Sequence, residues 1–262
     1  MNFAFDLISD LHVETWPNFD WTYQATAPYC IVAGDIGRDI EMVRDTLTHL
    51  GQCYKGVFYI DGNDEHRYSL DDLGRSYAVL NRAIDNIPNV VYMQDNVVII
   101  NGVAILATNG WWGFDFDPAL DYDQAQEWCK DRYNLTQSTI EQMTAISYTD
   151  TAYMSNSIRK LQTHKDVRAI VCVTHTVPVP ELVKYDLEIV DTWRFNTMGN
   201  RHMQVALDED TENKIKVWCF GHYHRPVDQL WAGVRYVSNC RGRGDTDWKQ
   251  PVYFPKRIEV EI

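Results

Sequence analysis

The sequence predicts a mixed α/β fold, and two observations carry this prediction. Short apolar runs of strand length alternate with segments of helical periodicity along the 262 residues, which is the layout of an α/β sheet. The pair Asn101-Gly102 stands between two such runs and indicates a tight hairpin, so the sheet arrangement is not purely parallel.

The apolar runs are the predicted strands, because they are rich in Val, Ile, Phe and Tyr. They cover residues 3–8, 29–33, 56–60, 96–100, 103–108, 169–174, 215–220, 234–238 and 257–262.

Two segments have the apolar spacing of amphipathic helices. The first has apolar residues at 40, 43, 47 and 50, and Gly51 follows as a stop. The second has an apolar face from Leu73 to Ile87. Weaker helical patterns cover 123–134 and 154–164.

The length fits a single domain, 1–262, which is long enough to bury roughly three quarters of its unfolded surface. No internal repeat or low-complexity linker divides the chain. The apolar signal is weaker at about 109–166 and at 181–213, so we expect helical and loop insertions there, near the ends of the sheet.

Composition narrows the class of protein. The 24 Lys and Arg against 37 Asp and Glu give a net charge of −13, which disfavours a nucleic-acid polymer as partner. No uncharged stretch reaches the roughly 18 residues of a membrane span. The six cysteines form no close pair, and three lie inside apolar runs, so we expect reduced core residues in a cytoplasmic protein.

Five of the predicted strands end in side chains that bind metals, at the edge where open α/β sheets collect ligands. The endings are "SDLH" with Asp10 and His12, "AGDI" with Asp35, "DGND" with Asn63, "VTHT" with His175, and "FGHYH" with His222 and His224. Taken singly, each has a structural explanation as a turn, a cap or a bonded core residue. The one-residue gap within the first and last endings, however, puts both side chains on one side of extended backbone, which suits chelation.

Together the endings offer two Asp, one Asn and four His, too many ligands for one tetrahedral ion. We therefore expect two divalent transition-metal ions that share a carboxylate. Nitrogen and oxygen donors without thiolate suit Mn, Fe, Zn or a similar ion.

In the order D-x-H, G-D, G-N, H and G-H-x-H, these blocks resemble the calcineurin-like metallophosphoesterase superfamily. Segments 102–116 and 237–244 resemble a bacterial phosphohydrolase branch of it, so the resemblance covers nearly the whole chain. It implies a two-sheet mixed β-sandwich flanked by helices. It also implies two ligand sets that share Asp35 as a bridge: the first is Asp10, His12, Asp35 and His224, and the second is Asp35, Asn63, His175 and His222.

The family's usual general acid is a His directly after the Asn ligand, and here that position is Asp64. Three alternatives remain open. A protonated Asp64 donates the proton, although two neighbouring cations favour its ionised form. His66 substitutes as the acid, or else is a solvated side chain. The substrate has a leaving group that needs no acid.

The implied reaction is hydrolysis of a phosphomonoester or phosphodiester by a hydroxide that bridges the two ions. The partner is then a small phosphorylated substrate, and Arg225, Arg241 and Arg243 are candidates for binding its remaining oxygens. The four aromatic residues of "WWGFDF" (111–116) either stack on a nucleobase or pack in the core, and we expect packing for at least two. The alternative function is an interaction scaffold with little or no catalysis. The presence of all seven ligand positions argues against a decayed site.

Overall fold

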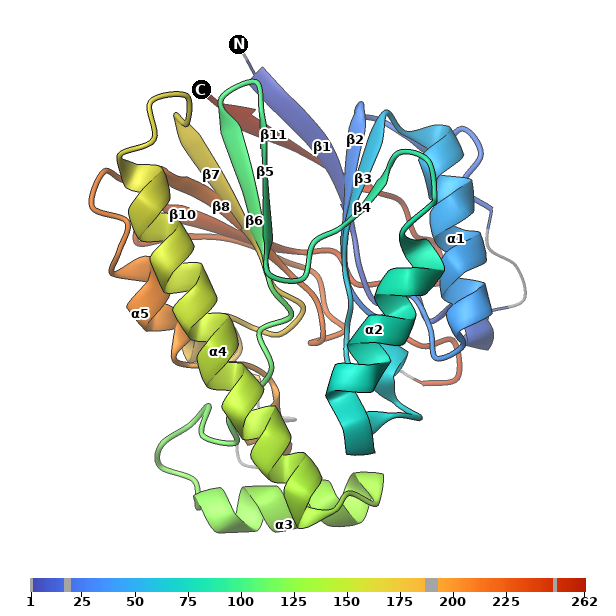
Figure 1. The fold of residues 1–262 in the computed structure, drawn as a ribbon, viewed down its shortest axis with the longest axis vertical. Helices are drawn as coiled ribbons and strands as arrows, with labels where there is room; N and C mark the ends of the chain where they lie inside the picture. The colour runs from blue at the N-terminus through green and yellow to red at the C-terminus, as the bar shows by residue number, and fades with distance from the viewer. Residues whose placement is uncertain (1, 17–19, 187–192, 247–248) are drawn as a thin grey trace.

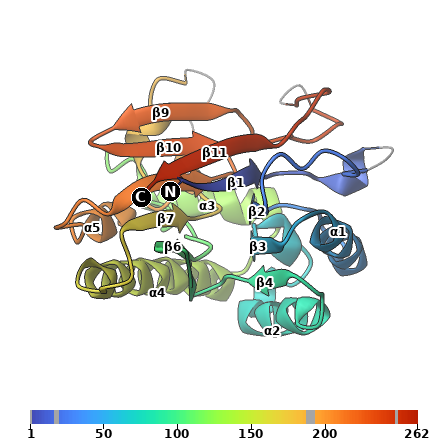
Figure 2. The same cartoon turned by 90° about the horizontal axis from the view of Figure 1, so that it is seen from above.

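The computed structural model of the protein describes residues 2–16, 20–186, 193–246 and 249–262. Within these residues the strands form two sheets, each of mixed direction, and helices lie on the outer face of each sheet (Figure 1). The view from above shows the same layering (Figure 2). The predicted fold class, a two-sheet α/β sandwich flanked by helices, is confirmed.

The first sheet has the order β11-β1-β2-β3-β4, in which β11 is antiparallel to β1 and the other neighbours are parallel. Its strands are β1 (Asn2–Ile8), β2 (Tyr29–Ala33), β3 (Gly56–Ile60), β4 (Val90–Tyr92) and β11 (Lys256–Glu261).

The second sheet has the order β5-β6-β7-β8-β10-β9, with antiparallel pairs at both edges and parallel pairs between. Its strands are β5 (Asn96–Ile100), β6 (Val103–Ala107), β7 (Ala169–Val173), β8 (Ile215–Phe220), β9 (Val227–Trp231) and β10 (Val234–Ser238).

The helices pack on both sheets and beyond one end of them. In the described residues they are α1 (Ile40–Cys53), α2 (Leu73–Ile84), α3 (Tyr122–Tyr133), α4 (Gln137–Gln162) and α5 (Met203–Leu207). The first two share a core with the outer face of the first sheet, and α4 and α5 share one with the second sheet. Every helix in the described part of the chain is too short or too polar to cross a membrane.

The alternation of side chains along β7 shows how the layers are held together. Ala169, Val171 and Val173 face the other sheet, whereas Ile170 and Cys172 face the helices. Because both faces are buried, such a strand appears in the sequence as an unbroken apolar run. Burial of apolar surface is the main favourable contribution to folding, at roughly 25 cal/mol for each Å² removed from water.

All the predicted strands are present, and two more were not predicted. β4 has only three residues, and β9 is an edge strand whose last four residues are exposed. Neither carries enough apolar alternation to be recognised. The predicted hairpin is confirmed, since Asn101 and Gly102 have φ of 51° and 86° and join the antiparallel strands β5 and β6.

The predicted helix ends were less accurate. α1 continues past Gly51 to Cys53, so Gly51 is not a stop. It is buried, and a Cβ there would lie 2.5 Å from the carbonyl oxygen of Pro88, so close packing explains the glycine. α2 ends at Ile84 instead of Ile87. The pattern at 154–164 is only the last part of the 26-residue helix α4.

The two predicted insertion segments contain most of the structure beyond the strand ends. Residues 109–166 include α3 and α4, and the second half of α4 packs on the second sheet as the crossover from β6 to β7. Segment 181–213 includes the 3-10 turn Trp193–Thr197 and α5, while its residues 187–192 lie outside the described residues. The aromatic run 111–116 is packed in the core, with all four rings at most 4% exposed.

Candidate metal centre

The loops that follow β1, β2 and β8 bring one group of predicted ligands together. Donor atoms of Asp10, His12, Asp35 and His224 all lie within 4.8 Å of one another. The Nε2 atoms of His12 and His224 are 3.0 Å apart, and Nε2 of His224 lies 3.4 Å from Oδ1 of Asp10. β1 and β2 are parallel neighbours in the first sheet and β8 belongs to the second, so residues distant in sequence meet where strands of both sheets end.

A second group lies beside the first and shares Asp35 with it. Asp35, His175 and His222 have donor atoms within 4.8 Å of one another. Nε2 of His175 lies 3.4 Å from Oδ1 of Asp35 and 3.2 Å from Oδ1 of Asn63. The structure thus brings all seven predicted ligands together, with Asp35 between the two groups.

Two of the histidines have their proton positions fixed by backbone carbonyls. Nδ1 of His175 lies 2.9 Å from the carbonyl of Ala33, and Nε2 of His222 lies 3.0 Å from that of Thr197. Because a carbonyl only accepts, these nitrogens must carry the protons. The lone pairs on His175 Nε2 and His222 Nδ1 then remain for another partner, as in metal-binding histidines.

The ionisation of the site also fits bound cations. Burial lowers the pKa of His222 to about 3 and that of His224 to about 4, so both imidazoles are neutral at pH 7. Burial, together with the carboxylates of Asp64 and Glu65, raises the pKa of Asp35 well above its ordinary value. Neutral imidazoles and crowded carboxylates are the donor set that divalent ions prefer.

The backbone at the site is held in a costly conformation. Asp10, His12, Asp35, His222 and His224 have φ between 42° and 62°, in the left-handed region. Each such residue costs on the order of 1–3 kcal/mol, although Asp and His tolerate the region better than most. Strain concentrated at five of the seven predicted ligands is typical of a functional site.

Glu65 joins the loops that carry Asp35 and Asn63. Its carboxylate accepts hydrogen bonds from the backbone N–H groups of Gly62 (2.8 Å), Asp35 (3.1 Å) and Ile36 (2.7 Å). A Cβ at Gly62 would lie 2.1 Å from Oδ1 of Asp35, so only glycine permits this approach. Glu65 was not among the predicted site residues, because nothing in its spacing indicates backbone partners in another loop.

Asp64 lines the site as an ionised carboxylate. Its Oδ2 lies 2.9 Å from Nε of Arg38, 3.2 Å from Nη1 of Arg243 and 3.4 Å from Nδ1 of His12. Burial alone would raise the pKa of Asp64, but His12 and Arg38 lower it well below its ordinary value. A carboxylate in this state accepts hydrogen bonds and has no proton to donate.

His66 does not reach the site, although it is only two residues from Asp64. Its ring is fully buried, with Nε2 2.8 Å from Oδ2 of Asp61 and Nδ1 2.8 Å from Oγ of Ser76. The ring also contacts Tyr77 and Trp111. His66 is therefore not a solvated side chain, and it is not placed to protonate the leaving group of a substrate bound at the predicted metals.

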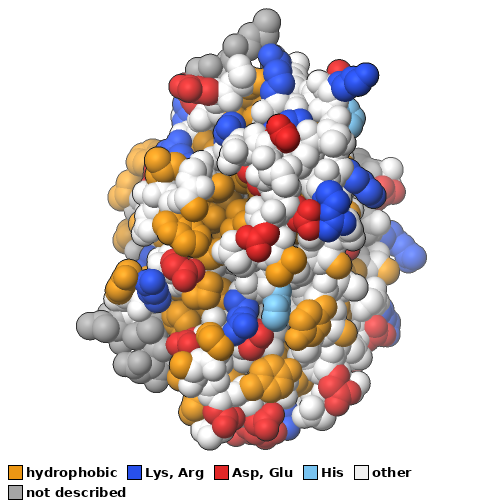
Figure 3. Space-filling view, turned by 90° about the vertical axis from the view of Figure 1, so that its left-hand side faces the viewer, with side chains coloured by type: hydrophobic (Ala, Val, Ile, Leu, Met, Phe, Trp, Pro, Cys, Tyr) orange, Lys and Arg blue, Asp and Glu red, His pale blue; other side chains and the backbone are white. Residues whose placement is uncertain are grey.

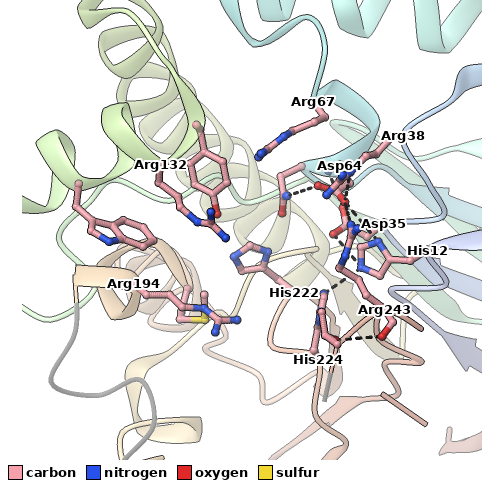
Figure 4. Close-up of a pocket in the computed structure, with 15 residues that line it drawn as sticks. His12, Asp35, Arg38, Asp64, Arg67, Arg132, Arg194, His222, His224 and Arg243 are labelled. Atoms are coloured by element: carbon pink, nitrogen blue, oxygen red, sulfur yellow. Dashed lines mark hydrogen bonds and ion pairs between the residues drawn. The ribbon is translucent and has the colours of Figure 1, made fainter. Parts of the chain in front are cut away.

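A cavity of about 340 Å³ opens beside the predicted ligands (Figure 4). Among the described residues that line it are five arginines: Arg38, Arg67, Arg132, Arg194 and Arg243. On the outer face in Figure 3, by contrast, acidic and basic side chains are interspersed.

Of the three arginines proposed from sequence, the structure brings Arg243 to this cavity. Arg225 and Arg241 are not among the described residues that line it. Nη1 of Arg225 lies 3.2 Å from Asp186, and the guanidinium of Arg241 lies 4.2 Å from the ring centroid of Trp16. The other four lining arginines come from separate loops and helices, and no local motif marks them in the sequence.

The fold and the paired clusters define a class: a two-sheet sandwich with a shared aspartate at its strand ends, which is the metallophosphoesterase fold. The solved structures with a similar fold include the following two. Phosphopantetheinyl hydrolase (PptH) from Mycobacterium tuberculosis superposes with a TM-score of 0.73 at 19% identity, over 97% of this chain and 95% of that one. A putative 5'-nucleotidase from Staphylococcus aureus superposes with a TM-score of 0.51 at 15% identity, over 93% of this chain and 49% of that one. At these identities the likeness is one of fold. No family model matches the sequence, and no curated protein is similar enough in sequence to match.

Proposed function

We propose that the protein is a dinuclear metal-dependent phosphoesterase that hydrolyses a phosphomonoester or phosphodiester. The observation that carries the proposal is the position of Asp35, whose carboxylate belongs to both donor clusters. When bound, two divalent ions would supply Lewis acidity and make a water nucleophilic at neutral pH. The metallophosphoesterase fold, shared with a hydrolase over nearly its whole length, supports the proposal.

In this proposal the chain's own residues hold the metals and the substrate. The seven predicted ligands bind the ions, and Asp64 orients His12 through its Nδ1 atom. Arg243 and Arg38 reach into the cavity beside Asp64, where they bind non-bridging phosphoryl oxygens. Their bonds to Asp64 fix both guanidinium groups before the substrate arrives.

The proposed substrate has a leaving group that does not need a proton from the protein. Asp64 is an acceptor held by two arginines, and His66 faces away from the cavity. Aryl phosphates and other esters of acidic alcohols fit this requirement, as do phosphoanhydrides. A phosphopantetheinyl ester is a further compound to test, because the similar Mycobacterium tuberculosis protein is named for that activity.

The test is hydrolysis by the metal-reconstituted protein. Activity on p-nitrophenyl phosphate or bis(p-nitrophenyl) phosphate, with Mn, Fe or Zn added, should be abolished in Asp35→Asn. The control is Asp45→Asn, which removes an exposed carboxylate from α1 and should keep full activity. A metal-loaded protein that hydrolyses no monoester, diester or anhydride would instead support the scaffold function.

A further inference from the structure

Three arginines gather on one wall of the cavity. Arg67 follows the turn after β3, Arg132 comes from α3, and Arg194 comes from the 3-10 turn Trp193–Thr197. Figure 4 shows Arg132 and Arg194 across the cavity from His12 and Asp35. We refer to Arg67, Arg132 and Arg194 as the arginine wall.

One member of the arginine wall contacts an aromatic side chain, that of Tyr133. Cζ of Arg67 lies 4.4 Å from the centroid of the Tyr133 ring. Burial raises the pKa of the Tyr133 hydroxyl, and the charges of all three wall arginines act against that rise. All three guanidinium-bearing residues and Tyr133 line the same cavity.

Two members of the arginine wall, Arg67 and Arg132, differ from Arg194 in their partners. In the parts of the chain that the structure describes, neither Arg67 nor Arg132 forms an ion pair with a carboxylate. Arg194 does have partners, among them the charge of Asp186, so the unbalanced charge is that of Arg67 and Arg132. Like charges held together in a concave site attract an anion.

The two arginines on the opposite side of the cavity already have a carboxylate partner. Arg38 and Arg243 both bind Asp64, so their charge is partly balanced before any substrate arrives. A phosphoryl group at the predicted metals therefore does not account for the arginine wall.

Building on the proposed phosphoesterase function, we propose that the arginine wall binds a second anionic group of the substrate, a phosphate or a carboxylate, remote from the phosphoryl group that is hydrolysed. The substrate class is thus a phosphoester with anionic groups at both ends. Trp128 and Tyr133 line the same cavity and present ring surfaces to the part of the substrate between those ends.

The test uses non-hydrolysable probes, so it does not depend on catalysis. Isothermal titration calorimetry on the full-length protein with Mn²⁺ compares α,ω-alkane bisphosphonates and phosphonoalkanoates of increasing length with alkylphosphonates of matched length. At least one probe with two anionic groups should bind about tenfold or more tighter than the alkylphosphonate of matched length, the value of one charge-assisted hydrogen bond. The larger gain in affinity, from the second phosphonate or from the carboxylate, identifies the second anionic group of the substrate.

Variants then test whether this gain in affinity comes from the arginine wall. Arg67→Gln and Arg132→Gln should each reduce the preference for the doubly anionic probe by about tenfold, and Arg132→Lys should restore part of it. The matched control is Arg82→Gln, which changes an exposed arginine in the last turn of α2 and should keep the full preference. Thermal unfolding of each variant confirms that it is folded.

Two results would overturn the proposal: no doubly anionic probe is preferred by the wild-type protein, or the preference survives in both glutamine variants. The wild-type comparison is informative even if a variant fails to fold. A probe preference that depends on the arginine wall, in a protein that binds no metal, would leave this inference standing while the proposed phosphoesterase function fails.

Discussion

Asp35→Asn is the sharpest test of the metal centre, because it changes charge with little change of shape. Oδ1 of Asp35 accepts a hydrogen bond of 2.8 Å from the backbone N–H of Asp64, and an amide oxygen can accept the same bond. What the variant loses is the negative charge shared by the two donor clusters. It also relieves the repulsion among the carboxylates of Asp10, Asp35, Asp64 and Glu65.

The relief of repulsion and the loss of the shared charge should change stability in opposite directions without and with bound metal. Without metal, Asp35→Asn should be at least as stable as the wild type, because carboxylate crowding is relieved. With metal at 100 times its Kd, the wild type gains about 2.7 kcal/mol, which corresponds to a rise in Tm of about 5–11 °C for a domain of this size. The variant should lose most of that rise.

Differential scanning calorimetry with and without Mn²⁺ or Zn²⁺ measures both effects, and elemental analysis gives the number of ions bound. Asp45→Asn, with a carboxylate that is exposed on α1, should behave as the wild type does. A variant that keeps the full metal-dependent rise in Tm would show that Asp35 does not hold the ions. A wild type that shows no rise with any of these ions would rule out the metal centre itself.

Three further predictions concern residues around the ligands. Asp64→Asn should weaken metal binding about 10- to 100-fold, because it removes the carboxylate 3.4 Å from Nδ1 of His12, and an unchanged affinity in a metal titration would contradict this role. Glu65→Gln should lower the free energy of unfolding, measured in urea, by about 1–3 kcal/mol. The reason is that an amide N–H₂ would then face the backbone N–H groups whose hydrogen bonds one carboxylate oxygen now accepts. Equal unfolding midpoints for the variant and the wild type would contradict this. Burial raises the pKa of Asp150 from 3.8 to about 8, so the folded protein binds its proton more tightly than the unfolded chain does. Stability should therefore fall as pH rises from about 4 to about 8, and Asp150→Asn should reduce this fall in a series of Tm values, whereas parallel curves would show that Asp150 is not its source.

Much of the fold could be predicted because its strands are locally marked. β7 is buried on both faces, so its sequence is apolar throughout, and Asn101-Gly102 has the backbone freedom that a tight hairpin requires. The gathering of the predicted ligands followed from the strands that precede them, which end together although they belong to two sheets.

What the sequence did not reveal depends on contacts between distant segments. Gly51 looks like a helix stop in isolation, yet it is required by the approach of Pro88 from another loop. Arg132 is one charged residue on a polar helix, and only the packing of α3 against the 3-10 turn Trp193–Thr197 and the aromatic loop after β6 brings it into the cavity. His66 is two residues from Asp64, but its direction is set by Asp61 and Ser76.

The position of Trp112 has a practical consequence. Its indole ring stacks on the imidazole of His222, with centroids 5.3 Å apart and an interplanar angle of 23°. An ion at His222 would sit within quenching range of this fluorophore, and paramagnetic Mn²⁺ or Fe²⁺ should dim its emission more than Zn²⁺ does. Replacing Trp112 by Phe should reduce that difference, so metal occupancy can be followed by intrinsic fluorescence without any added dye.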